Sequence, residues 1–116
     1  MSVSTHVLDT ARGRPAKGVP VTLSHRGTDR RWSVVGRGVT DADGRIRELS
    51  EVGLSQGGLA VGVYKLDFDT GAYFDMQGTA AFYPEVSVSF NVSDPAEHLH
   101  VPLLLSPFGY ATYKGK

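Results

Sequence analysis

Two histidines separated by one residue, His98 and His100, are the most conspicuous chemical groups in this sequence. If this stretch is a strand, both histidines lie on one face, while Leu99 and Val101 lie on the other. An imidazole titrates near neutral pH, so it can donate or accept a proton in a reaction. The same pattern is also typical of a half-buried strand face with no chemical role, so the pair alone does not establish a site.

Three more residues carry groups that could act together with these imidazoles. His6 lies in an alternating stretch near the start, Arg45 follows an Asp-Gly turn, and Tyr113 lies close to the end. A guanidinium can polarise a carbonyl or balance an oxyanion. Taken singly, each of these residues is more often structural than catalytic. Ser106 is part of a turn and not a nucleophile, because no Gly-x-Ser-x-Gly motif surrounds it.

Composition excludes several classes of function. The chain has 116 residues and we expect a single domain over 1–116, with 12 basic and 12 acidic residues, no net charge and no cysteine. A disulfide framework, a thiolate nucleophile and a Cys-bound metal are therefore excluded. We expect no nucleic-acid or membrane partner, since there is no polybasic stretch and no apolar run of ~20 residues. The first residues lack the pattern of a signal peptide, so we expect a cytoplasmic protein.

The alternation of apolar and polar residues predicts an all-β chain that positions these groups. Seven strands are expected, with an eighth short strand near Arg45, and together they suit a sandwich of two antiparallel sheets. The seven cover residues 3–9, 19–25, 31–39, 59–69, 86–92, 98–105 and 110–113. The polar stretch 10–18 and the segment 51–58 are expected to be loops or irregular.

Within these elements, several orientations follow from the sequence pattern. Residues 70–78 could form a short helix that begins at Thr70 as its N-cap and stops at Gly78. Trp32 and Val34 are expected to face the core, and His25 is expected on the surface beside a hairpin loop.

Five separated blocks of the chain resemble, in order, the pattern of the transthyretin-like 5-hydroxyisourate hydrolases. They are THVLDT at 5–10, GRPA at 13–16, TDADGR at 40–45, FYPEV at 82–86, and an ending that reads His-x-His-x-Pro-Leu-Leu-Leu-Ser-Pro-x-x-Tyr-x-Thr-Tyr-x-Gly. Any one block is a weak signal, but all of them in register cover nearly the whole chain.

The resemblance implies a transthyretin-like (prealbumin-like) two-sheet β-sandwich with one short helix, assembled as a homotetramer that is a dimer of dimers. It implies active sites in a channel between the subunits. The implied substrate is the small molecule 5-hydroxyisourate, an intermediate of urate degradation. It is hydrolysed to 2-oxo-4-hydroxy-4-carboxy-5-ureidoimidazoline without a metal or organic cofactor.

The family's functional residues can be carried over to positions of this chain. The catalytic residues would be His6, Arg45 and His100. The substrate-binding residues would be Tyr113, Lys114 and His98.

The chain departs from the family pattern at its end. Lys114 and Lys116 stand where the family usually has Arg and Ser, and Leu99 replaces an aromatic residue between the two histidines. A lysine keeps the positive charge but lacks the planar two-pronged donor of arginine. These changes could alter the rate or the substrate.

Two alternatives to a hydrolase follow from the same residues. A transthyretin-type carrier would share the fold and bind small ligands in the same channel without catalysis. A zinc site formed by His6, His98 and His100 would resemble a catalytic zinc centre with one open position.

Overall fold

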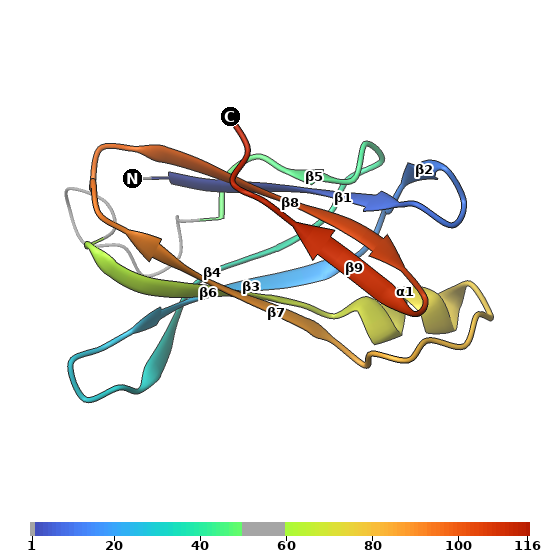
Figure 1. The fold of residues 1–116 in the computed structure, drawn as a ribbon, viewed down its shortest axis with the longest axis horizontal. Helices are drawn as coiled ribbons and strands as arrows, with labels where there is room; N and C mark the ends of the chain where they lie inside the picture. The colour runs from blue at the N-terminus through green and yellow to red at the C-terminus, as the bar shows by residue number, and fades with distance from the viewer. Residues whose placement is uncertain (1, 50–59) are drawn as a thin grey trace.

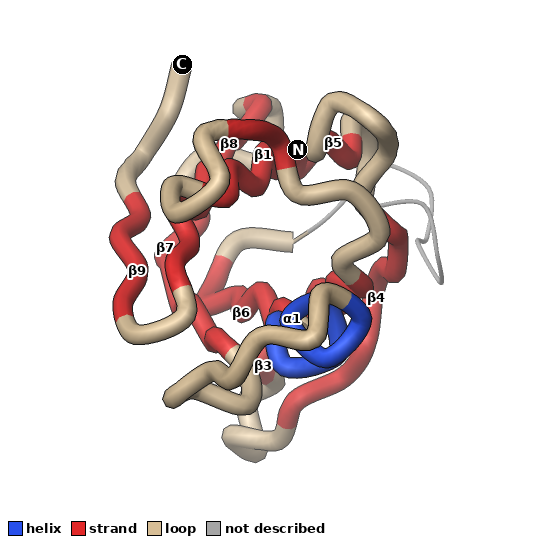
Figure 2. The backbone as a smooth tube through the Cα atoms, turned by 90° about the vertical axis from the view of Figure 1, so that its right-hand side faces the viewer, coloured by secondary structure: helices blue, strands red, loops and turns tan. Residues whose placement is uncertain are grey.

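A computed structural model describes residues 2–49 and 60–116 and shows two β-sheets packed face to face (Figures 1 and 2). The first sheet contains β1 (Ser2–Asp9), β2 (Arg14–Pro15), β5 (Arg45–Ile46), β8 (His98–Ser106) and β9 (Gly109–Thr112). The second contains β3 (Pro20–Arg26), β4 (Trp32–Val39), β6 (Gly62–Phe68) and β7 (Val86–Val92). The strand orders are β2-β1-β8-β9, with β5 also paired to β1, and β4-β3-β6-β7.

This architecture confirms the two-sheet sandwich with one short helix. The seven predicted strands are present, and the eighth is β5. The short strand β2 was missed because it lies within a polar stretch that reads as a loop. The segment 51–58, expected to be irregular, lies outside the described residues, as does residue 59 of the fourth predicted strand.

The pairing of β1 with β8 departs from the antiparallel arrangement that we expected. These strands run parallel in a register that joins Ser2 to His98, Ser4 to His100 and His6 to Pro102. Strands far apart in the sequence need no hairpin between them, so nothing in the local sequence specifies their direction. The parallel register determines which side chains meet on the outer face of this sheet.

The core lies between the two sheets and is built by the apolar face of each strand. In β8, alternate residues point inward as the period of two predicts, and the same holds for β1 and β7. The fully buried side chains include Val3, Val7, Val21, Leu23, Tyr64, Leu66, Phe68, Val86, Leu103 and Leu105. The opposite face of β1 and β8 is thereby left for polar groups.

The prediction for β4 was wrong, since Trp32 and Val34 are 38% and 42% exposed. The β3–β4 pairing shifts register between Leu23 and Ser24. An extra residue in one strand reverses which face its neighbours occupy, so it is Val35 that packs against the core. Sequence alternation does not reveal such a bulge.

The helix α1 (Thr70–Met76) lies at one end of the sandwich, beside β3 and β6 (Figure 2). Its N-cap is Asp69 and not Thr70, because the Asp69 carboxylate accepts the backbone N–H three residues on. Gly78, with φ +66°, follows its end. The Tyr73 hydroxyl donates to Asp9 at 2.7 Å and so fastens the helix to β1. Within residues 2–49 and 60–116, no helix is long and apolar enough to cross a membrane.

His25 is half-buried and not simply on the surface. Its ring lies 4.7 Å from the ring of the buried Tyr64, measured between centroids. This histidine therefore belongs to the packing of the second sheet, away from the other three histidines.

Candidate functional site

Strands β1, β5 and β8 bring the predicted catalytic residues together on the outer face of the first sheet. In the strand registers, His6 lies opposite Arg45 on β5 and opposite Pro102 on β8. Ser4, two residues before His6, lies opposite His100. Three segments far apart in the sequence thus contribute side chains to one surface, as Figure 1 shows for the strands.

The turn before β5 sets the position of Arg45. The Asp41 carboxylate accepts the backbone N–H groups of Asp43 and Arg45, both at 2.9 Å. The pKa of Asp41 is lowered, chiefly because the Arg45 N–H stabilises its charged form. Gly44 has φ +76°, and a Cβ there would lie 2.4 Å from the Val7 carbonyl oxygen, so the turn requires glycine. The Asp-Gly-Arg sequence therefore holds the start of β5 against β1.

Hydrogen bonds link the two histidines of β8 through a serine of β1. The Ser4 hydroxyl oxygen lies 2.8 Å from Nδ1 of His100 and 3.0 Å from Nε2 of His98. The other nitrogen of His98, Nδ1, is hydrogen-bonded to the Ser2 hydroxyl. Ser4 is only 8% exposed, whereas His98 is exposed. Because Nδ1 of His100 is engaged, Nε2 is the nitrogen that remains for chemistry.

The surroundings of His100 favour its neutral form. Burial is the main cause that lowers its pKa, and the positive charges of His6, Arg45 and His98 lower it further. A neutral imidazole at neutral pH is the form that can accept a proton from water.

A polar hollow of about 260 Å³ lies between β1, β5 and β8. Three residues with cationic side chains line it, Arg45, Arg47 and Lys116, and no Asp or Glu is among the described residues that do so. Its other lining residues are Ser4, Thr5, Ile46, His98 and His100. His6 does not line this hollow, although it pairs with Arg45 at its edge. A small, positively charged hollow with imidazoles suits an anionic or carbonyl-rich ligand.

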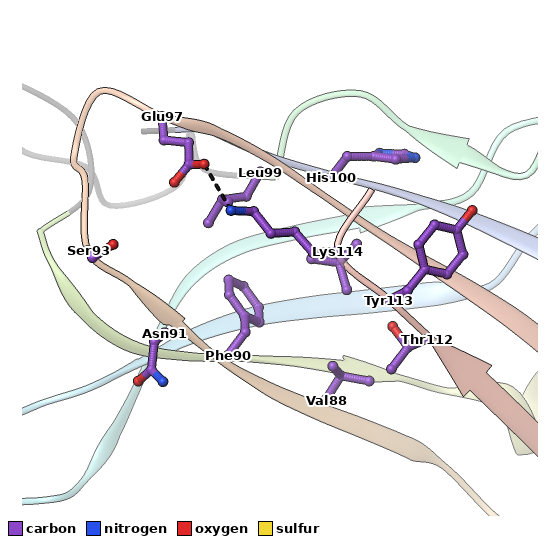
Figure 3. A pocket seen from close by; sticks show the side chains of 11 residues that line it. Val88, Phe90, Asn91, Ser93, Glu97, Leu99, His100, Thr112, Tyr113 and Lys114 are labelled. Atoms are coloured by element: carbon purple, nitrogen blue, oxygen red, sulfur yellow. Dashed lines mark ion pairs between the residues drawn. The ribbon is translucent and has the colours of Figure 1, made fainter. Parts of the chain in front are cut away.

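A second hollow, about 370 Å³ in volume, opens between β7 and the β8–β9 pair (Figure 3). Its lining is largely apolar and includes Val88, Phe90 and Leu99, with Tyr113 and Lys114 also on it. His100 borders both hollows. In the part of the chain that the structure describes, Lys114 is the one Lys or Arg among the residues that line the larger hollow, whereas Arg45, Arg47 and Lys116 line the smaller one, so the smaller hollow is the better candidate for the chemistry.

Figure 3 shows Lys114 extending to Glu97, and the two charged atoms lie 3.2 Å apart. Its ammonium group therefore already has a carboxylate partner. The backbone N–H of Gly115 donates to the His100 carbonyl oxygen at 2.8 Å, which fastens the end of the chain to β8. The substrate-binding roles of Tyr113, Lys114 and His98 remain predictions.

The zinc site considered for His6, His98 and His100 is not formed. Within the part of the chain that the structure describes, no three His, Cys, Asp or Glu side chains are arranged to hold a metal ion. The reason is local, because His98 and His100 each direct a ring nitrogen to the Ser4 hydroxyl and not to a common centre.

Sequence reasoning gave no role to Ser2, Ser4 or Arg47, and it named Lys116 only as a departure from the family pattern. Ser4 shares the period-two face of His6, so its side of the strand could have been read from the sequence. Its contact with two histidines depends on the parallel β1–β8 register, which could not.

Comparison with known proteins shows the family to which this chain belongs. The model of the HIUase/Transthyretin family matches residues 3–115. The 5-hydroxyisourate hydrolase of Salmonella dublin is 43% identical over 113 residues, which cover 97% of this chain and 79% of that protein.

Two solved structures show the same fold. The 5-hydroxyisourate hydrolase of Klebsiella pneumoniae superposes with a TM-score of 0.83 at 35% identity and full coverage of both chains. Sea bream transthyretin, described in complex with thyroxine, has a TM-score of 0.86 at 35% identity, covering 97% of this chain and 93% of that one. Fold similarity alone thus does not separate enzyme from carrier, but the family match over 3–115 is unambiguous: this chain belongs to the HIUase/Transthyretin family.

Proposed function

We propose that this protein is a 5-hydroxyisourate hydrolase, which opens a ring of its substrate by hydrolysis of a cyclic amide. Relatives with this name support the assignment. The observation that carries it is that Arg45 and His100 line one cationic hollow of about 260 Å³, with His6 paired to Arg45 at its edge. The product is 2-oxo-4-hydroxy-4-carboxy-5-ureidoimidazoline, whose carboxylate suits that charge.

Each catalytic group has a role that fits its position. His100 acts as the general base, and Nε2 takes a proton from the attacking water because Nδ1 is held by Ser4. Arg45 polarises the carbonyl and stabilises the oxyanion as it forms. His6, beside Arg45, supplies the second imidazole, from which the leaving nitrogen can receive a proton. Tyr113 and Lys114 shape the pocket and bind the substrate, and His98 has a supporting role beside His100.

We further propose that the protein works as a homotetramer, a dimer of dimers with its sites in a central channel. Strands β7 and β9 are the last strands of their sheets, so each offers an unpaired backbone edge to a second subunit. A net charge of zero leaves little repulsion between subunits. Light scattering that reports four times 12.5 kDa would support this assembly, and a monomer would refute it. The cytoplasmic location stays a prediction.

The experiment for the hydrolase adds the protein to urate and a urate oxidase and follows the transient absorbance of 5-hydroxyisourate. We expect the intermediate to decay faster than it does spontaneously. An unchanged decay with folded protein would overturn the proposal.

A small-ligand carrier is the second candidate. The largely apolar hollow beside Tyr113 and the similarity to sea bream transthyretin favour it. It predicts saturable binding of thyroxine without any effect on 5-hydroxyisourate. A titration of the protein with thyroxine, run beside the decay assay, separates the two functions.

A further inference from the structure

We propose that Ser4 is a positioning residue, which orients His100 and passes the proton that His100 takes up on to His98. This inference rests on the proposed hydrolase function and adds to it a path for the proton. It also gives His98 a role that acts through Ser4 and not through the substrate.

The geometry forms a continuous chain of hydrogen bonds. Ser4 Oγ lies 2.8 Å from His100 Nδ1 and 3.0 Å from His98 Nε2, and His98 Nδ1 is bonded to the Ser2 hydroxyl. All four residues lie on two strands joined by eight parallel pairs, which hold the groups in place. Such a chain connects a half-buried base to an exposed imidazole.

The hydrogen-bonding capacity of Ser4 specifies the resting protonation. A hydroxyl donates one hydrogen bond and accepts others, and a neutral imidazole has one donor and one acceptor nitrogen. For His100 to act as a base at Nε2, its Nδ1 must carry the hydrogen and donate it to Ser4. Ser4 then donates to Nε2 of His98, which in turn donates from Nδ1 to Ser2. Every hydrogen bond of the chain is satisfied in this direction.

Each bond that forms in the transfer replaces a bond that breaks. Nε2 of His100 takes a proton from water, whose remaining hydroxide attacks the carbonyl. The Nδ1–H bond of His100 breaks as an O–H bond to Ser4 forms. The original O–H bond of Ser4 breaks as an N–H bond to His98 forms. His100 ends neutral, Ser4 is unchanged, and the positive charge rests on His98.

The positive charge that His100 gains when it takes up a proton is better placed on His98. His100 is half-buried and faces His6 from β1 and Arg45 from β5. A positive charge on His100 is disfavoured there. His98 is exposed, so water can stabilise the same charge. Moving the proton from His100 to His98 therefore transfers the charge from a half-buried ring to one that water can reach.

The first test compares Ser4→Ala with Ser4→Thr, which restores the hydroxyl, and with Ser24→Ala, a buried serine of the other sheet that serves as a matched control. We expect Ser4→Ala to lower kcat about 10- to 100-fold, a part of the ~10²–10⁴-fold typical of acid–base catalysis, with KM little changed. Ser4→Thr should recover most of kcat, and Ser24→Ala should leave it unchanged. An unaltered kcat in Ser4→Ala would overturn the proposal.

The second test is a double-mutant cycle with His98→Asn. If His98 acts through Ser4, the double variant loses no more kcat than Ser4→Ala alone. Losses that multiply would show that His98 acts on the substrate independently, and would refute the relay.

A third measurement does not depend on activity. The ¹⁵N chemical shifts of the His100 ring report which nitrogen carries the hydrogen, and we expect Nδ1–H in the natural protein and a mixture in Ser4→Ala. A mixture in both would contradict the positioning role, even with an active enzyme. If the natural protein has no hydrolase activity but shows the Nδ1–H form, the proposed function fails and the positioning of His100 stands.

Discussion

Gly115 in the Tyr-x-Gly ending is predicted to be required because it lies against His100, the proposed general base. A Cβ added at this position would lie 2.7 Å from Cδ2 of His100 and 3.1 Å from its carbonyl oxygen. An ordinary contact begins at 3.4 Å, so in Gly115→Ala the ring or the chain segment must move by about 0.7 Å. A misplacement of ~1 Å can cost ~10²-fold in rate, so we expect kcat/KM to fall about 10- to 100-fold.

The assay is the decay of 5-hydroxyisourate, combined with a thermal melt to confirm that the variant is folded. Gly109→Ala is the matched control, because the nearest atom to its added Cβ is Ser106 Oγ at 3.8 Å. It should keep its activity within about twofold, since no atom must move. Full activity in Gly115→Ala would refute the argument that the end of the chain holds His100 in place.

Three further predictions follow from other contacts. The pKa of His100 is lowered from 6.5 and the base must be neutral, so kcat/KM should rise with pH with a midpoint below 6.5. Arg45→Gln removes a positive charge that lowers this pKa, so it should move the midpoint to higher pH. A midpoint above 6.5 in the natural protein would contradict this. Asp41→Ala should lower activity more than Asp41→Asn, whose amide oxygen can still accept the two backbone N–H groups; equal activity of the two variants would count against the turn. Tyr73→Phe should leave activity unchanged but lower the free energy of unfolding, measured in urea, by ~1–3 kcal/mol, because it removes a hydrogen-bond partner from the buried Asp9. Unchanged stability would argue against the hydrogen bond from Tyr73 to Asp9.

Much of the fold could be predicted because its strands alternate cleanly. In β7, Val86 and Val92 are buried while Ser87 and Ser89 are exposed, as the period of two requires. The same rule failed in β4, where a bulge in the pairing turned Trp32 outward. The sequence pattern of a strand indicates which of its faces is apolar, whereas a bulge depends on how the strand pairs with its neighbour.

In the candidate site, too, some features could be predicted from the sequence and others could not. The face that carries His6 and the face that carries His100 followed from alternation alone, and the resemblance to a known family supplied Arg45. The contact of Ser4 with two imidazoles required the parallel β1–β8 register, and the ion pair of Lys114 with Glu97 required the path of the last residues. Contacts between distant segments are set by the fold, so they appear only in the structure.

If His100 is the base of a hydrolase, removing its imidazole must cost far more activity than removing a histidine elsewhere in the fold. The rate of 5-hydroxyisourate decay is measured for His100→Ala and for His25→Ala, which removes a histidine from the opposite sheet. We expect a loss of ~10²–10⁴-fold in kcat/KM for His100→Ala and near-natural activity for His25→Ala. Near-natural turnover in a folded His100→Ala variant would contradict the role of His100 as the base.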